Sequence, residues 1–187
     1  MSDTVTDKPG LLDLPGSDRL HIGGKEKKDG WKILNIQAGE GVDYVGDIRD
    51  LSSFSENSFD IVYASHVLEH VSHNNEIHAA LRGVCRILRP GGKFFVSVPD
   101  LDTLCRLFIH KRATKEWRFL IMRIMFGNQS DAHDFHQVGL AADFLADFLH
   151  AAEFKEVHRV SELGVFDDTS SLRVHGILVS LNMVAIK

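Results

Sequence analysis

The stretch from Phe59 to Val98 restricts the fold of this chain more than any other segment. Phe59 to Ala64 is a nearly continuous apolar run, which is typical of a strand buried on both faces of a parallel sheet. Apolar residues then recur at steps of three and four between Ile77 and Leu88, which predicts an amphipathic helix. A Pro-Gly-Gly sequence at 90–92 ends this helix, and a second apolar run begins at Lys93. This order predicts two parallel strands joined by a right-handed crossover.

Other short runs extend this unit into a larger sheet. Strands are expected at Arg19–Ile22, Trp31–Ile36 and Val42–Val45, one or two helices between Leu101 and Met125, a helix from Leu140 to Ala152, and a final antiparallel strand between His175 and Ile186. We therefore predict the α/β class, with a doubly wound, mostly parallel sheet in a single domain at 19–187. Residues 1–18 contain two Pro-Gly turns and no apolar period, so we expect a flexible leader there.

Composition limits the partners and the compartment. A net charge of −5 gives no basic excess, so neither a nucleic acid nor a membrane is expected as partner. Cys85 and Cys105 lie in apolar stretches without a CxxC pair, which fits a reducing compartment. The N-terminus lacks a signal-peptide pattern, and the longest apolar tract is too short to cross a bilayer. We expect a cytoplasmic protein with a small-molecule substrate, and the sequence leaves a homo-oligomer open.

In an open parallel sheet, ligands bind beyond the carboxyl ends of the strands. Gly23 and Gly24 follow the first expected strand, and glycine lets a ligand approach the backbone closely. Gln37 follows the second strand and can bond a ribose hydroxyl, while Asp47 follows the third and can accept from an adenine amino group. Each of these residues alone is more typical of an ordinary turn.

Four blocks in sequence are more specific. They are Leu20-His-Ile-Gly-Gly24, Gly46-Asp-Ile-Arg-Asp-Leu51, Phe59-Asp-Ile-Val-Tyr-Ala-Ser-His-Val-Leu-Glu-His70 and Ile87-Leu-Arg-Pro-Gly-Gly-Lys-Phe-Phe-Val-Ser-Val-Pro99. Through them the chain resembles the core of the class I S-adenosylmethionine-dependent methyltransferases, in particular the type 11 group. The resemblance implies a Rossmann-like methyltransferase sheet and S-adenosylmethionine as cofactor.

The resemblance also implies roles for individual residues. Gly23 and Gly24 would pass under the methionine part of the cofactor, and Gln37 would stand where the family has a ribose-binding acid. Asp47 and Ile48 would contact the adenine, and Ser65 and His66 would line the pocket beside the sulfonium. The reaction would be an in-line attack of a substrate nucleophile on the methyl group, with the protein mainly positioning the reactants.

Two departures from the family pattern affect the cofactor site. The glycine turn is not GxGxG, and the stretch before Trp31 is shorter than the dozen residues that a helical crossover needs, so we expect the first helix to be missing or reduced to a turn. Gln37 also lacks the charge of the usual acid. The alternative function is therefore a non-catalytic binding or assembly module with a degraded cofactor site. A dehydrogenase is disfavoured because no GxGxxG opens a helix.

The chain has 11 histidines, and some of them suggest acid–base or metal chemistry. His66 to His70 matches the HxxEH pattern of zinc proteases, but no distal ligand accompanies it and the family resemblance explains it without metal. Residues 127–139 form a polar loop that we expect to act as a lid. His70 and His136 are the candidate bases for a hydroxylated acceptor, by analogy a surface-polysaccharide sugar. No metal is predicted; the alternatives for the loop are helix capping, solvated side chains, or an ion on Asp131, His133 and His136.

Overall fold

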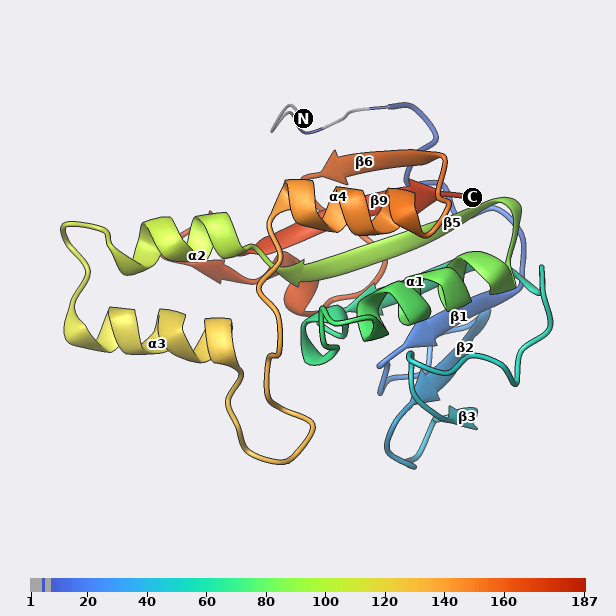
Figure 1. Ribbon diagram of the computed structural model, residues 1–187, viewed down its shortest axis with the longest axis horizontal. Helices are drawn as coiled ribbons and strands as arrows, with labels where there is room; N and C mark the ends of the chain where they lie inside the picture. The colour runs from blue at the N-terminus through green and yellow to red at the C-terminus, as the bar shows by residue number, and fades with distance from the viewer. Residues whose placement is uncertain (1–4, 6–7) are drawn as a thin grey trace.

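The computed structural model describes residue 5 and residues 8–187 (Figure 1). A seven-stranded sheet forms its centre, with strand order β3-β2-β1-β4-β5-β9-β6. The strands of this sheet are β1 (Arg19–Ile22), β2 (Trp31–Asn35), β3 (Tyr44–Val45), β4 (Phe59–Ser65), β5 (Leu88–Pro99), β6 (Glu156–Val160) and β9 (Ser180–Ile186). The helices are α1 (Glu76–Ile87), α2 (Leu101–Phe108), α3 (Lys115–Phe126) and α4 (Ala142–Ala151), with short 3-10 turns η1 (Leu68–His70) and η2 (Thr169–Ser171). A small hairpin joins β7 (Arg173–Val174) to β8 (Ile177–Leu178).

The sheet confirms the predicted fold class. β1 pairs in parallel with both β2 and β4, and β4 pairs in parallel with β5. β9 is antiparallel to β5 and to β6. The chain order therefore runs outward in both directions from β1 and β4, which makes this pair the topological switch point where ligands bind in such sheets. In the described part of the chain, no helix is long and apolar enough to cross a membrane.

Helices cover one face of this sheet (Figure 1). Ile77, Leu81 and Val84 on α1 and Leu145 and Leu149 on α4 are fully buried against the strands. They recur at three- and four-residue steps, so each helix presents one apolar side to the sheet. Residues 23–30 join β1 to β2 without a helix, as their short length requires.

Irregular segments cover the opposite face. There Trp31, Tyr63 and Phe166 enclose the ring of His21, whose burial lowers its pKa to about 4 and keeps it neutral at neutral pH. The Tyr63 hydroxyl donates to Asp168 at 2.8 Å, which ties the segment before η2 to the sheet. Aromatic packing thus takes the place of a second helical layer.

The segment 8–18 also packs on this face, although a flexible leader was expected; residues 1–4 and 6–7 lie outside the described part. Leu11 is 3% exposed. The Lys93 ammonium donates to the backbone carbonyls of Gly10, Leu11 and Asp13 at 2.6, 3.1 and 2.9 Å. These contacts pair residues eighty or more positions apart in the chain, so no local sequence pattern could reveal them.

Replacing Leu11 tests whether this segment is part of the folded unit. Leu11→Ala removes a buried side chain and should lower the free energy of unfolding by roughly 2–5 kcal/mol. Its neighbour Leu12 is 43% exposed, so Leu12→Ala should stay within about 0.5 kcal/mol of the wild type. Urea unfolding of both variants measures the difference. Equal, negligible effects would mean that the segment is a loose leader.

Candidate active site

A cavity of about 650 Å³ opens beyond the carboxyl ends of β1, β2 and β3. The turn after β4 and the loop 127–139 supply the rest of its lining. Of the residues that the sequence suggested, six line this cavity: Gly23, Gln37, Asp47, Ile48, His66 and His70. Three others lie outside its lining: Gly24, Ser65 and His136. The volume is in the range usual for small-molecule sites.

The cavity floor depends on a tight turn at Gly23. Its φ of +80° belongs to the left-handed region, and a Cβ there would lie 2.6 Å from Cγ2 of Val67. Its N–H donates to the carbonyl of Leu34 at 2.8 Å, which closes the turn onto β2. Only glycine fits this position without a shift of its neighbours.

Asn35 joins the loops that follow β1 and β2. Its buried side-chain amide donates to the carbonyls of Gly24 at 2.9 Å and Gly23 at 3.3 Å. Its Oδ1 accepts the backbone N–H of Gln37 at 2.9 Å. Gly24 therefore lies outside the cavity lining, where its carbonyl helps to fix the loop, while Gln37 lines the cavity. Sequence reasoning missed Asn35; the signal was a polar residue at the buried end of an apolar strand.

Asp47 enters the cavity already paired with Arg49. Its Oδ1 accepts from the Arg49 backbone N–H at 2.9 Å and from Nε at 3.0 Å. Burial acts to raise the pKa of Asp47, but the hydrogen bonds from Arg49 outweigh it and hold the pKa below its usual value. The carboxylate stays ionised and keeps lone pairs for a further donor, such as an amino group. Ile48 beside it is almost fully buried and offers an apolar surface.

Ser65 points away from the cavity. Side chains alternate between the two faces along a strand, so Ser65 shares a face with Tyr63. Its Oγ lies 3.3 Å from Oγ1 of Thr169, on the side of the sheet that the irregular segments cover. His66, with a left-handed φ of 53°, turns the chain back toward the cavity.

Glu69 is a buried carboxylate among imidazoles. It is 1% exposed, and its Oε1 lies 3.3 Å from Nδ1 of His66 and 4.0 Å from Nε2 of His136. Within the described chain neither of its oxygens accepts a hydrogen bond of good geometry. Burial acts to raise the pKa of Glu69, but the neighbouring imidazoles, His66 foremost, lower it below its usual value. A negative charge is therefore held beside the cavity wall.

His70 and His136 meet edge to face, with ring centroids 4.8 Å apart. Nδ1 of His70 lies 3.1 Å from the carbonyl oxygen of Phe135. Because a carbonyl only accepts, this contact places a proton on Nδ1, and in the neutral ring the lone pair then lies on Nε2. Burial lowers the pKa of His136, although the charge of Glu69 opposes this shift. His70 thus lines the cavity, and His136 packs against the His70 ring outside the cavity lining.

The same cluster has the composition of a metal site. Glu69, His70 and His136 each offer a ligand atom, and these atoms lie within 4.8 Å of one another. Among the residues that the structure describes, the loop acid Asp131 and His133 do not join this group. An ion on these ligands would occupy the imidazole lone pairs that a proton acceptor needs. The two roles are therefore mutually exclusive and can be separated by experiment.

The loop 127–139 forms one wall of the cavity and is tied to η1. The backbone N–H of Gln137 donates to the carbonyl of Glu69 at 2.7 Å, and its side-chain amide donates to the carbonyl of His70 at 2.9 Å. Within the loop, the Asp134 carboxylate accepts from the hydroxyl of Ser130 at 2.8 Å. Opening and closing of this wall as a lid stays a prediction.

Comparisons with known proteins agree with this geometry. The family model described as a methyltransferase domain matches residues 26–96. This part of the chain is therefore similar to methyltransferase domains. No curated protein matches the sequence.

Solved methyltransferases share the fold over nearly the whole chain. An S-adenosylmethionine-dependent methyltransferase from Archaeoglobus fulgidus is 16% identical, with a TM-score of 0.58 over 92% of this chain and 87% of that one. One from Thermotoga maritima is 18% identical, with a TM-score of 0.57 over 93% and 84%. A Burkholderia thailandensis N-methyltransferase solved with S-adenosylhomocysteine is 18% identical, with a TM-score of 0.54 over 91% and 71%. At these identities the likeness establishes the fold.

The residues that line this cavity are chemically suited to S-adenosylmethionine, the methyl donor of methyltransferase domains. The Gly23 turn leaves open the space that a Cβ would take, Gln37 offers an amide for hydroxyls, and Asp47 offers an ionised acceptor beside the apolar Ile48. The fit differs from the family pattern at Gln37, whose neutral amide makes weaker hydrogen bonds to hydroxyls than a carboxylate does.

Gly23 offers a direct test of this cofactor site. Gly23→Ala should weaken binding of S-adenosylhomocysteine at least tenfold, because the added methyl group collides with Val67 and distorts the turn. Gly176→Ala is the matched control, since Gly176 has the same φ of +80° but nothing within 4 Å of the added Cβ. Isothermal titration calorimetry on both variants measures the affinity, and thermal unfolding measures the strain. Equal affinities would contradict this site.

Proposed function

We propose that this methyltransferase transfers a methyl group from S-adenosylmethionine to a hydroxyl group of a small acceptor, with His70 as the general base. The observation that carries the proposal is the contact between His70 Nδ1 and the Phe135 carbonyl. The Nδ1–H is held by this carbonyl, so the lone pair on Nε2 is the one left free at a cavity-lining side chain. A hydroxyl nucleophile needs such an acceptor for its proton.

The residues around the cavity divide into three tasks. Gly23 and Gln37 hold the methionine and ribose parts of the cofactor, and Asp47 with Ile48 holds the adenine. When bound, S-adenosylmethionine supplies an electrophilic methyl group on its sulfonium. His66 borders the reacting region, and His70 takes the proton of the acceptor hydroxyl on Nε2 as the oxygen becomes nucleophilic. The placement of both reactants in one cavity accounts for most of the rate enhancement.

Glu69 and His136 are positioning residues for this base. The carboxylate of Glu69 lies within 4.8 Å of the ligand atoms of both histidines, and its negative charge favours the imidazolium that forms on His70. His136 stays neutral because burial lowers its pKa, so it adds no competing positive charge. Its ring packs edge-on against His70 and restricts the rotation of that side chain.

The polar wall of the cavity supports a sugar as acceptor. Side chains capable of hydrogen bonding line the loop 127–139 on the cavity side: Asn128, Ser130, Asp131, His133, Asp134 and Gln137. Such a wall suits a polyhydroxylated molecule, which needs many donors and acceptors on leaving water. We therefore include a sugar of surface-polysaccharide synthesis as the preferred acceptor class. The alternative is a non-catalytic binding module, for which Gln37 and the missing first helix leave a weaker cofactor site.

Substitution of His70 tests the assigned base. His70→Gln should lower the rate of S-adenosylhomocysteine release in the presence of a hydroxylated acceptor by roughly 10²–10⁴-fold. His73→Gln, at an exposed position outside the cavity lining, is the control and should keep the wild-type rate. A panel of sugars and nucleotide sugars, with the matching deoxy compounds, identifies the acceptor. Unchanged turnover in His70→Gln, with cofactor affinity also unchanged, would contradict the proposal.

Metal removal distinguishes a general-base role of His70 from a role as a metal ligand. After dialysis against EDTA the wild type should keep its rate, because a protonatable His70 needs no ion. Loss of activity that returns with Zn²⁺ or Mn²⁺ would instead assign Glu69, His70 and His136 to a metal centre.

A further inference from the structure

The hairpin formed by α2 and α3 is strongly basic within an acidic protein. Residues 101–126 contain six basic residues and two acidic residues, Asp102 and Glu116, whereas the whole chain has a net charge of −5. The six basic residues, all exposed, are Arg106, Lys111, Arg112, Lys115, Arg118 and Arg123. The sequence-based expectation of no membrane partner rested on the charge of the whole chain, which hides this local excess.

Helix α3 has a second apolar side that faces solvent. Ile121 on its inner side is fully buried against Leu104 and Val179. On the outer side Phe119 is 58% exposed, Met122 36% and Phe126 56%. Their spacing of three and four residues puts these three side chains in one stripe along the helix. Large apolar side chains gathered on an exposed face mark an interaction site.

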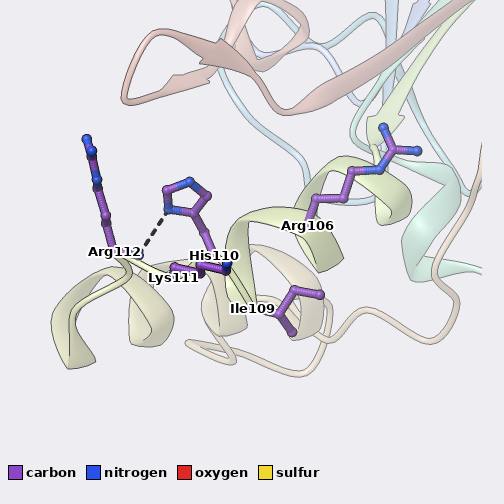
Figure 2. A pocket seen from close by; sticks show the side chains of 5 residues that line it. All are labelled: Arg106, Ile109, His110, Lys111 and Arg112. Atoms are coloured by element: carbon purple, nitrogen blue, oxygen red, sulfur yellow. Dashed lines mark hydrogen bonds between the residues drawn. The ribbon is translucent and has the colours of Figure 1, made fainter.

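The turn between the two helices also exposes basic and apolar side chains. A pocket of about 550 Å³ lies there, lined by Arg106, Ile109, His110, Lys111 and Arg112 (Figure 2). Ile109 is 78% exposed. Figure 2 shows the side chains of His110 and Arg112 projecting from the turn on the same side, and His110 Nδ1 accepts the Arg112 backbone N–H at 3.3 Å. The three cations of this pocket, Arg106, Lys111 and Arg112, could bind a phosphate group, and Ile109 adds an apolar surface beside them.

We propose that the α2–α3 hairpin docks this protein on an anionic phospholipid surface. The basic side chains contact lipid phosphates, and Ile109, Phe119 and Phe126 enter the boundary between headgroups and acyl chains. Basic and apolar residues mixed on one exposed helical face are the combination that binds such interfaces. The remainder of the chain is acidic, so the hairpin is the side that an anionic surface attracts.

The positive charge of the α2–α3 hairpin favours an anionic lipid surface over a second copy of the chain as its partner. A symmetric dimer through α3 would bring two like-charged hairpins together, because a two-fold interface pairs the same patch on both subunits. An anionic bilayer instead neutralises all six cations. Docking would also bring the loop 127–139, which begins directly after Phe126, close to the lipid surface. The proposal does not depend on the acceptor proposed above.

Vesicle sedimentation tests the docking. The wild type should sediment with vesicles of phosphatidylglycerol and phosphatidylcholine, remain in solution with phosphatidylcholine alone, and be released by 0.5 M NaCl, since screening weakens the phosphate contacts (about 4 Å Debye length at that salt). Phe119→Ser/Phe126→Ser and Lys111→Glu/Arg112→Glu should each weaken binding more than tenfold. The control Phe144→Ser removes a phenylalanine on α4 that is 52% exposed, and should bind like the wild type.

Two results would overturn the proposal. One is the absence of binding to anionic vesicles by the wild type, or an equal loss of binding in Phe144→Ser. The other is a dimer in sedimentation velocity without lipid that dissociates in Phe119→Ser/Phe126→Ser, which would assign the face to a second copy. Thermal unfolding of each variant verifies that these surface substitutions leave the fold intact.

Discussion

The cavity depends on the buried amide of Asn35. Its nitrogen donates to the carbonyls of Gly23 and Gly24, and its oxygen accepts from Gln37, so one side chain fixes the loops after two neighbouring strands. In a longer crossover, a helix would pack against the glycine turn and support it. Residues 23–30 contain no helix. The buried amide replaces that support, and its loss would leave three backbone groups without partners inside the protein. This arrangement explains how the cavity keeps its shape on a sheet with helices on one face.

Charged residues are distributed unevenly over the protein. Carboxylates lie at the cavity, and basic residues gather on the α2–α3 hairpin. Glu69 is held ionised by imidazoles beside the cavity, and Asp47 is held ionised by Arg49 at its other end. Asp47 stands where the adenine is proposed to bind, and Glu69 lies beside His70, where a proton would be accepted. The α2–α3 hairpin instead carries an excess of positive charge. The proposed catalysis and the proposed docking therefore depend on different charged residues.

The sequence predicted the centre of the fold well because its signals there are local. The apolar runs of β4 and β5 and the periodic α1 with its Pro-Gly-Gly stop could be placed within a few residues, and the order of motifs predicted the class of domain. Features that depend on distant contacts could not be foreseen. Leu11 is buried in a segment that Lys93 binds, Ser65 faces away from the cavity because of its strand register, and Glu69 is buried at a turn that Gln137 bonds from the loop 127–139. The edge strand β6 lacks an apolar run altogether, since it is only partly buried.

The central claim is that S-adenosylmethionine binds beyond β1, β2 and β3 although the first helix is missing. A ¹⁵N–¹H correlation spectrum of the labelled protein titrated with S-adenosylhomocysteine tests it most directly. The account predicts saturable shifts of the amide signals of Gly23, Gln37 and Ile48, with the signal of Ile109 on the distant hairpin unchanged. Shifts confined to the hairpin, or no shift at millimolar ligand, would contradict the account.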